Sequence, residues 1–477
     1  MIDGVSLSAV EGTQESAEFL SGVIEGFYGK PWTLAERVEL FGWMAAWRLN
    51  TYVYAPKDDL HHRALWREPY SSEDAGQLAQ VVEACRERNL RFIYALSPGL
   101  DIRYRDDSEL ASLQARVDQL HGLGCRDFSL LFDDIPDRLN SQDTDRWGSL
   151  ASAQCHVANA LFQWTRERLP RASSREPNSR FIFCPTAYCG RMAARKLGGD
   201  GYLATVGREL LPEIDIFWTG PDIVSRTITV AHVEELGSVL QRKPVIWDNL
   251  HANDYDARRI FCGPYSGRPR ELRSVVGGLL SNPNNEFPLN YVPLRTLAEF
   301  ARSEGAWNPR DAYIAAMREW LPSFATIGEA IALEDLVLFA DCYYLPHEEG
   351  TNAEALYACA RRLVTREPTA WGEDPVAFRR QAARLREFCV RITELRRRPL
   401  FHAFFRRIWE LREALDLMER YLKLRSASID RDGEAPAEFR LQGRGGFVPR
   451  LERLLADHAT GRAADRRNAT TLPGLAP

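Results

Sequence analysis

Two adjacent carboxylates close an apolar run in the first third of the chain. Residues 128–136 read Phe-Ser-Leu-Leu-Phe-Asp-Asp-Ile-Pro, so a segment of strand length ends in Asp133 and Asp134, and Pro136 stops further strand pairing. Burying one carboxylate at a strand end costs free energy, and a second one beside it adds like-charge repulsion. Such a pair is tolerated mainly where the charges do work, either in acid–base chemistry on a glycoside or in binding a metal.

Two other acidic pairs provide a comparison. The pair at 58–59 also follows an apolar run, whereas the pair at 106–107 lies in a polar stretch and is most simply the solvated start of a helix. Taken alone, residues 133–134 are as consistent with an ordinary loop or helix-cap pair as with a functional site. The elements around them must decide between these interpretations.

Strand-like apolar runs recur through the first 290 residues, at 22–28, 51–56, 91–98, 128–134, 180–186, 214–220, 244–249 and 277–283. Between them lie stretches with helical periodicity, such as 33–48, where Thr33 and Glu36 form a capping-box pattern. The repeated alternation predicts an α/β fold, namely a (β/α)8 TIM-like barrel; a doubly wound sheet is the alternative.

In such a barrel the functional side chains lie at the C-terminal ends of the strands. Nearly every predicted end carries groups suited to a sugar, because aromatic faces stack on C–H surfaces and polar side chains satisfy hydroxyls. In chain order these groups are Gly26 and Tyr28, Lys57-Asp58-Asp59, Ser97-Pro98-Gly99, Asp133-Asp134, Pro185 to Tyr188, Trp218-Thr219-Gly220, Trp247-Asp248-Asn249 with Asp254, and Asn282-Pro283-Asn284. The pattern predicts an active site at the barrel mouth.

The character of the chain changes after Asn290. The segments 374–398 and 401–424 are dense in Arg, Glu and Leu, which is typical of a helical bundle and of a surface that a homodimer can use. After Ile429 small residues, Pro and Arg dominate, apart from a short helical piece at 449–458. We therefore expect an N-terminal extension over 1–18, the catalytic barrel over 19–300, a stalk-like α-helical domain over 301–428, and a mobile or partly disordered tail over 429–477.

The composition excludes several classes of protein. The 477 residues are 45% apolar with a net charge of −5, which allows two or three domains with cores and argues against nucleic-acid binding. No uninterrupted apolar window of about 18 residues and no signal peptide is present, so no membrane partner is expected. Nine scattered cysteines without a C-x-x-C pattern predict buried thiols in a reducing cytoplasm, and only five lysines among 61 basic residues suggest a GC-rich bacterial genome.

Several familiar motifs can be set aside. Residues 443–446 nearly match a dinucleotide-binding loop, but no strand precedes them. Residues 347–349 lack the second histidine of a metalloprotease helix, and the histidines at 61–62 have no third metal ligand at helpful spacing. One metal site stays open as an alternative, using Asp133, Asp134, His251 and Asp254.

Six segments together resemble glycoside hydrolase family 84, a family of β-N-acetylglucosaminidases that includes the protein O-GlcNAcases. They are 22–32 (GVIEGFYGKPW), 50–59 (NTYVYAPKDD), 131–135 (LFDDI), 184–190 (CPTAYCG), 247–256 (WDNLHANDYD) and 281–284 (SNPN). The match covers about residues 20 to 300, in order and on the predicted strand ends. At Ala187 the chain departs from relatives that often carry a charged residue there, which bears on the pocket rim.

The resemblance implies hydrolysis of terminal β-linked N-acetylglucosamine (GlcNAc), on glycopeptides, proteins or free glycosides, without metal or other cofactor. The 2-acetamido oxygen of the substrate attacks C1 and forms an oxazoline, which replaces the usual enzyme nucleophile. By position, Asp133 would orient the acetamido N–H, while Asp134 would protonate the leaving oxygen and later take a proton from water. Alternation would point adjacent side chains to opposite faces, so the strand must bend or end between them.

Further roles carry over from matched positions. Gly26 and Lys57 would bind ring hydroxyls, and Asp254 and Asn284 would bind the 4- and 6-hydroxyls. Tyr188 and Asn249 would bind the acetamido group, and Trp247 would form the wall of the pocket for its methyl group. Tyr255 and Tyr28 are secondary candidates for substrate binding. Two alternatives stay open: a non-catalytic GlcNAc- or glycopeptide-binding barrel, and a metal-dependent hydrolase that uses the acid cluster. Binding alone would not require the costly acid pair, which argues against the first.

Overall fold

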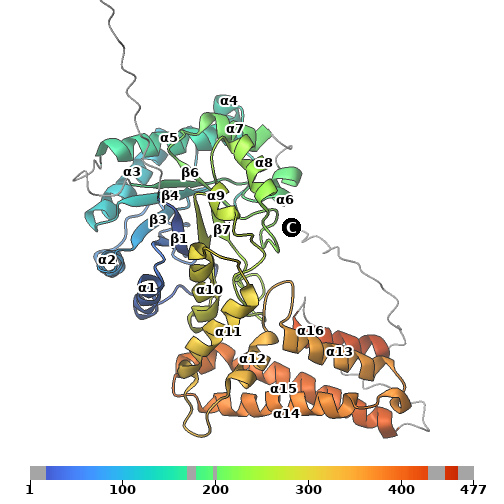
Figure 1. Cartoon of the computed structure of the whole chain (residues 1–477). Helices are drawn as coiled ribbons and strands as arrows, with labels where there is room; N and C mark the ends of the chain where they lie inside the picture. The colour runs from blue at the N-terminus through green and yellow to red at the C-terminus, as the bar shows by residue number, and fades with distance from the viewer. Residues whose placement is uncertain (1–17, 169–178, 197–200, 428–445, 460–477) are drawn as a thin grey trace, which may run out of the picture.

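Eight parallel strands follow one another in chain order around a closed barrel, in which β8 pairs with β1 (Figure 1). The computed structural model describes residues 18–168, 179–196, 201–427 and 446–459. The strands are β1 Leu20–Glu25, β2 Thr51–Tyr54, β3 Arg91–Leu96, β4 Asp127–Leu131, β5 Phe181–Cys184, β6 Asp215–Trp218, β7 Val245–Asp248 and β8 Gly278–Ser281. The predicted barrel is confirmed, and the doubly wound sheet is excluded.

Burial on both faces explains why the strands read as continuous apolar runs. Alternate side chains such as Ile24, Val53 and Leu131 fill the barrel interior, while their neighbours pack outward under the helices. The helices that accompany the strands are α1 Leu34–Trp47, α2 Ser72–Arg86, α3 Asp107–Gly122, α4 Ser141–Trp147, α5 Leu150–Arg168, α6 Gly190–Lys196, α7 Gly201–Glu209, α8 Val230–Leu240 and α9 Leu272–Val275.

Local signals set the starts of two of these helices. Thr33 and Glu36 form the predicted capping box of α1, each side chain bonding the other residue's backbone N–H. Asp106 caps α3 by accepting from the backbone N–H of Ser108, which confirms the pair at 106–107 as a helix start.

After β8 the described chain is mainly helical. α10 lies along the barrel and packs against α1 and β1, and the later helices form a second layer, drawn from yellow to red in Figure 1. These helices are α10 Tyr291–Arg302, α11 Pro309–Trp320, α12 Leu333–Asp341, α13 Thr351–Thr365, α14 Asp374–Arg391, α15 Arg398–Ala427 and α16 Phe447–Ala459. The domain boundary expected at 300 falls in the last turn of α10, and the domain limits stay predictions.

Within the expected tail, the structure describes one ordered helix. α16 packs on α13 and α15, with Leu451 and Leu455 fully buried. The other expected tail residues and the extension up to residue 17 lie outside the described residues.

All nine cysteines are buried free thiols, as their apolar surroundings predict. Among the described helices, none has the length and apolar character that crossing a bilayer requires.

Candidate active site

The chain turns sharply between the two acids at the end of β4. The strand stops at Leu131, and Asp134 has a φ of 51°, in the left-handed region that residues with a Cβ rarely adopt. The expected break in the strand is therefore present. Because of the turn, the carboxylates of Asp133 and Asp134 reach different partners.

Asp133 forms a buried ion pair across the barrel mouth. Its Oδ2 lies 2.5 Å from Nζ of Lys57, which follows β2, and only 5% of Asp133 is exposed. The Lys57 ammonium also lies 5.5 Å from the centre of the Trp247 ring. The other carboxylate oxygen, Oδ1, is buried and has no hydrogen-bond partner among the described residues.

Asp134 accepts hydrogen bonds from two phenols. The Tyr188 hydroxyl donates to Oδ1 at 2.8 Å, and the Tyr28 hydroxyl donates to Oδ2 at 3.0 Å. Burial and then the charge of Asp134 raise the pKa of both phenols, so both remain protonated donors. Tyr188 thus reaches the acid pair, but in this structure it orients Asp134.

Asp254 and two tyrosines form the rim of the site. The Tyr28 backbone N–H donates to Oδ2 of Asp254 at 2.9 Å. Burial raises the pKa of Asp254, and the negative charge of Asp134 adds to the shift. Tyr28 and Tyr255 are 41% and 52% exposed.

Gly26 and Trp247 form one wall together. A Cβ at Gly26 would collide with the indole of Trp247, so only glycine lets this backbone lie against the ring. The Trp247 ring packs edge-on against Phe217, with an interplanar angle of 78°. Its Nε1 is buried and has no partner among the described residues, which leaves a donor at the site.

Three asparagines at the ends of β7 and β8 have different roles. Asn282, which was expected at the end of the last strand but was given no role in sugar binding, accepts from the Gly26 backbone N–H at 3.3 Å and donates to Oδ1 of Asn249 at 2.9 Å. Asn249 in turn donates to the Ile223 carbonyl at 2.9 Å. The fully buried Asn284 instead bonds the backbone N–H and carbonyl of Phe261, at 2.8 and 3.0 Å.

The histidines considered as metal ligands bind backbone carbonyls. Nδ1 of His62 lies 2.7 Å from the Ala95 carbonyl, and Nε2 of His251 lies 3.0 Å from that of Gly263. Burial, and for His62 also the nearby Lys57 charge, lowers the pKa of His62 to about 3; burial lowers that of His251 to about 4. Within the described residues, no three His, Cys, Asp or Glu side chains form a metal-binding group.

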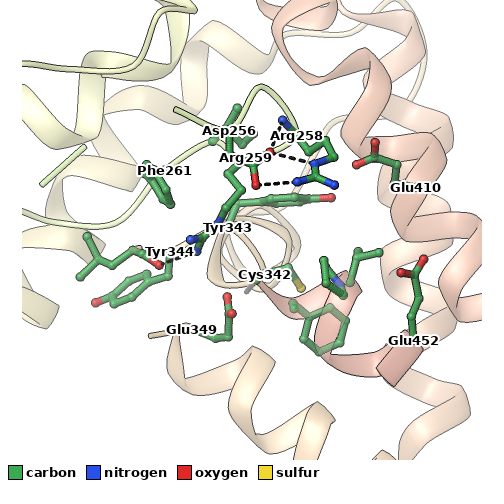
Figure 2. Close-up of a pocket in the computed structure, with 16 residues that line it drawn as sticks. Asp256, Arg258, Arg259, Phe261, Cys342, Tyr343, Tyr344, Glu349, Glu410 and Glu452 are labelled. Carbon is green, nitrogen blue, oxygen red and sulfur yellow. Dashed lines mark hydrogen bonds and ion pairs between the residues drawn. The ribbon is translucent and has the colours of Figure 1, made fainter. Parts of the chain in front are cut away.

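A second cavity of about 230 Å³ lies between the barrel and the helical layer (Figure 2). Its walls come from the loop at 256–261, the segment at 342–349, Glu410 of α15 and the start of α16. In Figure 2, Asp256 faces Arg258, with Oδ1 and Nε 2.8 Å apart. None of the expected sugar-binding residues lines this cavity.

These features define a (β/α)8-barrel protein with a paired-carboxylate site. A family model described as beta-N-acetylglucosaminidase matches residues 21–337, and the chain belongs to this family.

Curated relatives include the Protein O-GlcNAcase of Mus musculus, 47% identical over 301 residues, which cover 63% of this chain and 32% of the relative. The Protein O-GlcNAcase of Rattus norvegicus is 48% identical over 285 residues, covering 60% of this chain and 30% of the relative. The matched region thus spans about a third of these relatives. A solved structure of a mutant O-GlcNAc hydrolase from Thermobaculum terrenum superposes with a TM-score of 0.75 at 26% identity, covering 93% of this chain and 94% of the other.

Proposed function

We propose that the protein is a retaining β-N-acetylglucosaminidase of the O-GlcNAcase type, acting on terminal β-linked GlcNAc attached to Ser or Thr of glycopeptides or proteins. The observation that carries the proposal is the division of partners between two adjacent acids: Asp133 faces a cation, and Asp134 faces two phenols. Groups in such different surroundings suit two different roles in one reaction.

In the first step the acetamido oxygen of the bound sugar attacks C1 as the glycosidic C1–O bond breaks. Asp134 gives its proton to the departing oxygen, so the alcohol leaves neutral. Asp133 accepts a hydrogen bond from the acetamido N–H and balances the positive charge that develops on the closing oxazoline ring. Its buried Oδ1, which has no protein partner among the described residues, is the acceptor that supports this role.

In the second step Asp134, now a carboxylate, takes a proton from water as the water oxygen attacks C1 and the oxazoline opens. Each step inverts the configuration at C1, so the overall reaction retains it. Lys57 keeps the Asp133 charge compensated while the sugar excludes solvent.

The remaining residues would shape the sugar site. We propose that Trp247 walls the acetamido methyl group, that Asn249 and Tyr188 bind the acetamido oxygen, and that Gly26 and Lys57 meet ring hydroxyls. Asp254, which accepts from the Tyr28 backbone N–H, and the half-exposed Tyr255 beside it would receive the outer hydroxyls and the aglycone. Asn284 would donate to a hydroxyl only by releasing one of its Nδ2 bonds, to the Phe261 carbonyl or to Oδ1 of Asn290.

The test is release of 4-nitrophenol from its β-N-acetylglucosaminide, with the β-glucoside alongside. Wild type should cleave only the acetamido sugar, and Asp134→Asn should lose roughly two to four powers of ten in rate. Equal cleavage of the glucoside would show that the acetamide is not the nucleophile. No turnover of either sugar, with GlcNAc still bound, would favour the non-catalytic binding barrel.

We also propose that the protein works in a bacterial cytoplasm, where its nine buried thiols would stay reduced. Two copies would associate through the helical layer, where Phe405 and Trp409 of α15 are each 46% exposed. Light scattering of wild type and Trp409→Glu tests this: a monomeric wild type would refute the dimer.

A further inference from the structure

One loop carries the two positively charged side chains that contact Asp133 and Asp134. Residues 55–71 join β2 to α2, and they supply Lys57 to the carboxylate of Asp133 and Arg63 to the backbone of Asp134. Nη2 of Arg63 donates to the Asp134 carbonyl oxygen at 2.7 Å, and only 8% of Arg63 is exposed.

Arg63 has a second contact with the surroundings of Asp134. Its guanidinium carbon lies 5.7 Å from the centre of the Tyr28 ring, whose hydroxyl donates to Oδ2 of Asp134. The same side chain therefore contacts both the backbone of Asp134 and a ring that orients its carboxylate.

Arg63 differs from most other buried arginines. Arg37 pairs with Glu25 and Arg268 pairs with Asp248, whereas Arg63 and Arg116 make no ion pair with a carboxylate among the described residues. Arg116 instead donates to two backbone carbonyls and to a tyrosine hydroxyl, while the side chain of Arg63 donates to the Asp134 carbonyl. Its Nη1 is buried with no hydrogen-bond partner in the same set. A buried guanidinium without a carboxylate partner is costly, so its hydrogen bond to the Asp134 carbonyl is an important contact for this side chain.

The loop holds Arg63 on a rigid base. His62, the preceding residue, is fixed to the end of β3 and to the residue that follows it: its ring bonds the Ala95 carbonyl at 2.7 Å, and its own carbonyl accepts from the Ser97 N–H at 3.0 Å. In contrast, Asp134 lies in the left-handed conformation just after a strand has ended. The turn thus needs an external contact, and Arg63 provides one.

We propose that Arg63 is a positioning residue for the general acid: it fixes the turn at Asp134 so that the carboxyl group points at the glycosidic oxygen. The inference rests on the proposed function. Displacement of a catalytic group by about 1 Å can cost roughly a hundredfold in rate. A misplaced acid matters most when the leaving group is a poor one that must be protonated, and least when the leaving group departs as a stable anion.

The experiment compares Arg63→Met, Arg63→Lys and wild type on aryl β-N-acetylglucosaminides of decreasing leaving-group acidity, and on a GlcNAc-serine peptide. We expect Arg63→Met to lose roughly ten- to a hundredfold in kcat/KM on the peptide and under about threefold on the most activated aryl glycoside. Arg63→Lys keeps a hydrogen-bond donor and a positive charge, so its kcat/KM on the peptide should lie between the values for wild type and Arg63→Met. Arg67→Met is the matched control, because Arg67 lies in the same loop but pairs with Asp101 and Glu109.

Equal losses on all substrates, or none, at an unchanged Tm would overturn the positioning role. If Arg63→Met does not fold, the leaving-group dependence of Arg63→Lys decides: a slope equal to that of wild type overturns the role. A wild type inactive on every substrate would instead refute the proposed function itself.

Discussion

The ammonium of Lys57 lies 2.5 Å from Oδ2 of Asp133, and the two side chains are only 1% and 8% exposed. The pair links the ends of β2 and β4, which flank β3 in the barrel. Since no described residue bonds the other oxygen of Asp133, Lys57 is the group that compensates this carboxylate.

Removing Lys57 should therefore cost stability as well as activity. Breaking a buried ion pair by deleting one partner typically costs about 3–5 kcal/mol, because a buried charge is left alone. Lys57→Met should lose up to about this free energy of unfolding in urea titrations. Lys57→Met with Asp133→Asn should recover most of the stability but none of the activity, and the exposed Lys243→Met is the control. A double variant as unstable as the single one would contradict the pairing argument.

Loss of either phenol should weaken the acid's orientation. A hydrogen bond to a charged acceptor contributes about 1.5–3 kcal/mol. Tyr188→Phe and Tyr28→Phe should each lower kcat/KM by roughly ten- to a hundredfold. Tyr357→Phe, on α13, removes a hydroxyl away from the site and should leave the kinetics unchanged. Wild-type rates in both site variants would show that Asp134 needs neither donor.

Chelation should leave the activity intact. The proposed chemistry uses the substrate's acetamide and two carboxylates, so dialysis against EDTA should not change kcat/KM. The alternative is a metal-dependent hydrolase using the acid cluster. A loss that added Zn²⁺ or Mg²⁺ restores would establish that alternative.

Stability should fall with rising pH because of Glu349, which lines the second cavity. Burial raises its pKa from 4.5 to about 7, while Arg450 and Arg259 oppose the shift and Glu354 and Glu348 add to it. Between these two pKa values the folded state binds more protons than the unfolded state, so the free energy of unfolding decreases as pH rises from about 4.5 to about 7.

The measurement is urea unfolding of wild type and Glu349→Gln at several pH values. Glu349→Gln should abolish this decrease in the free energy of unfolding, which amounts to at most roughly 3 kcal/mol over the whole pH window. Glu304→Gln is the control, because Glu304 is exposed and is not among the charges that shift the pKa of Glu349. An unchanged slope in Glu349→Gln would mean that this carboxyl does not titrate in the window.

The barrel could be predicted because each strand is buried on both faces and ends in a polar group, which leaves a clear pattern in the sequence. Asp133 and Asp134 could be singled out because they directly follow one of these buried strands. The resemblance assigned hydroxyl binding to Asn284, but the sequence could not show that Asn282, on the other side of Pro283, contacts Gly26. That contact follows from the register of β8 against β1 and β7.

Arg63 had no recognisable signal. It lies in a loop without periodicity, and its hydrogen-bond acceptor is a backbone carbonyl, which every residue has. Such a contact depends on the tertiary fold and emerges only when β2 and β4 are placed around β3.

Barrel closure through β1 and β8 also determines when activity can arise during synthesis. Tyr28 bonds Asp254 and Gly26 bonds Asn282, across 226 and 256 positions of the chain. On the ribosome, β1 leaves the exit tunnel long before these partners exist, and one of its edges stays unpaired until β8 follows. A nascent chain ending before β8 therefore has both acids but no complete site, and catalytic competence appears only when the last strand closes the sheet.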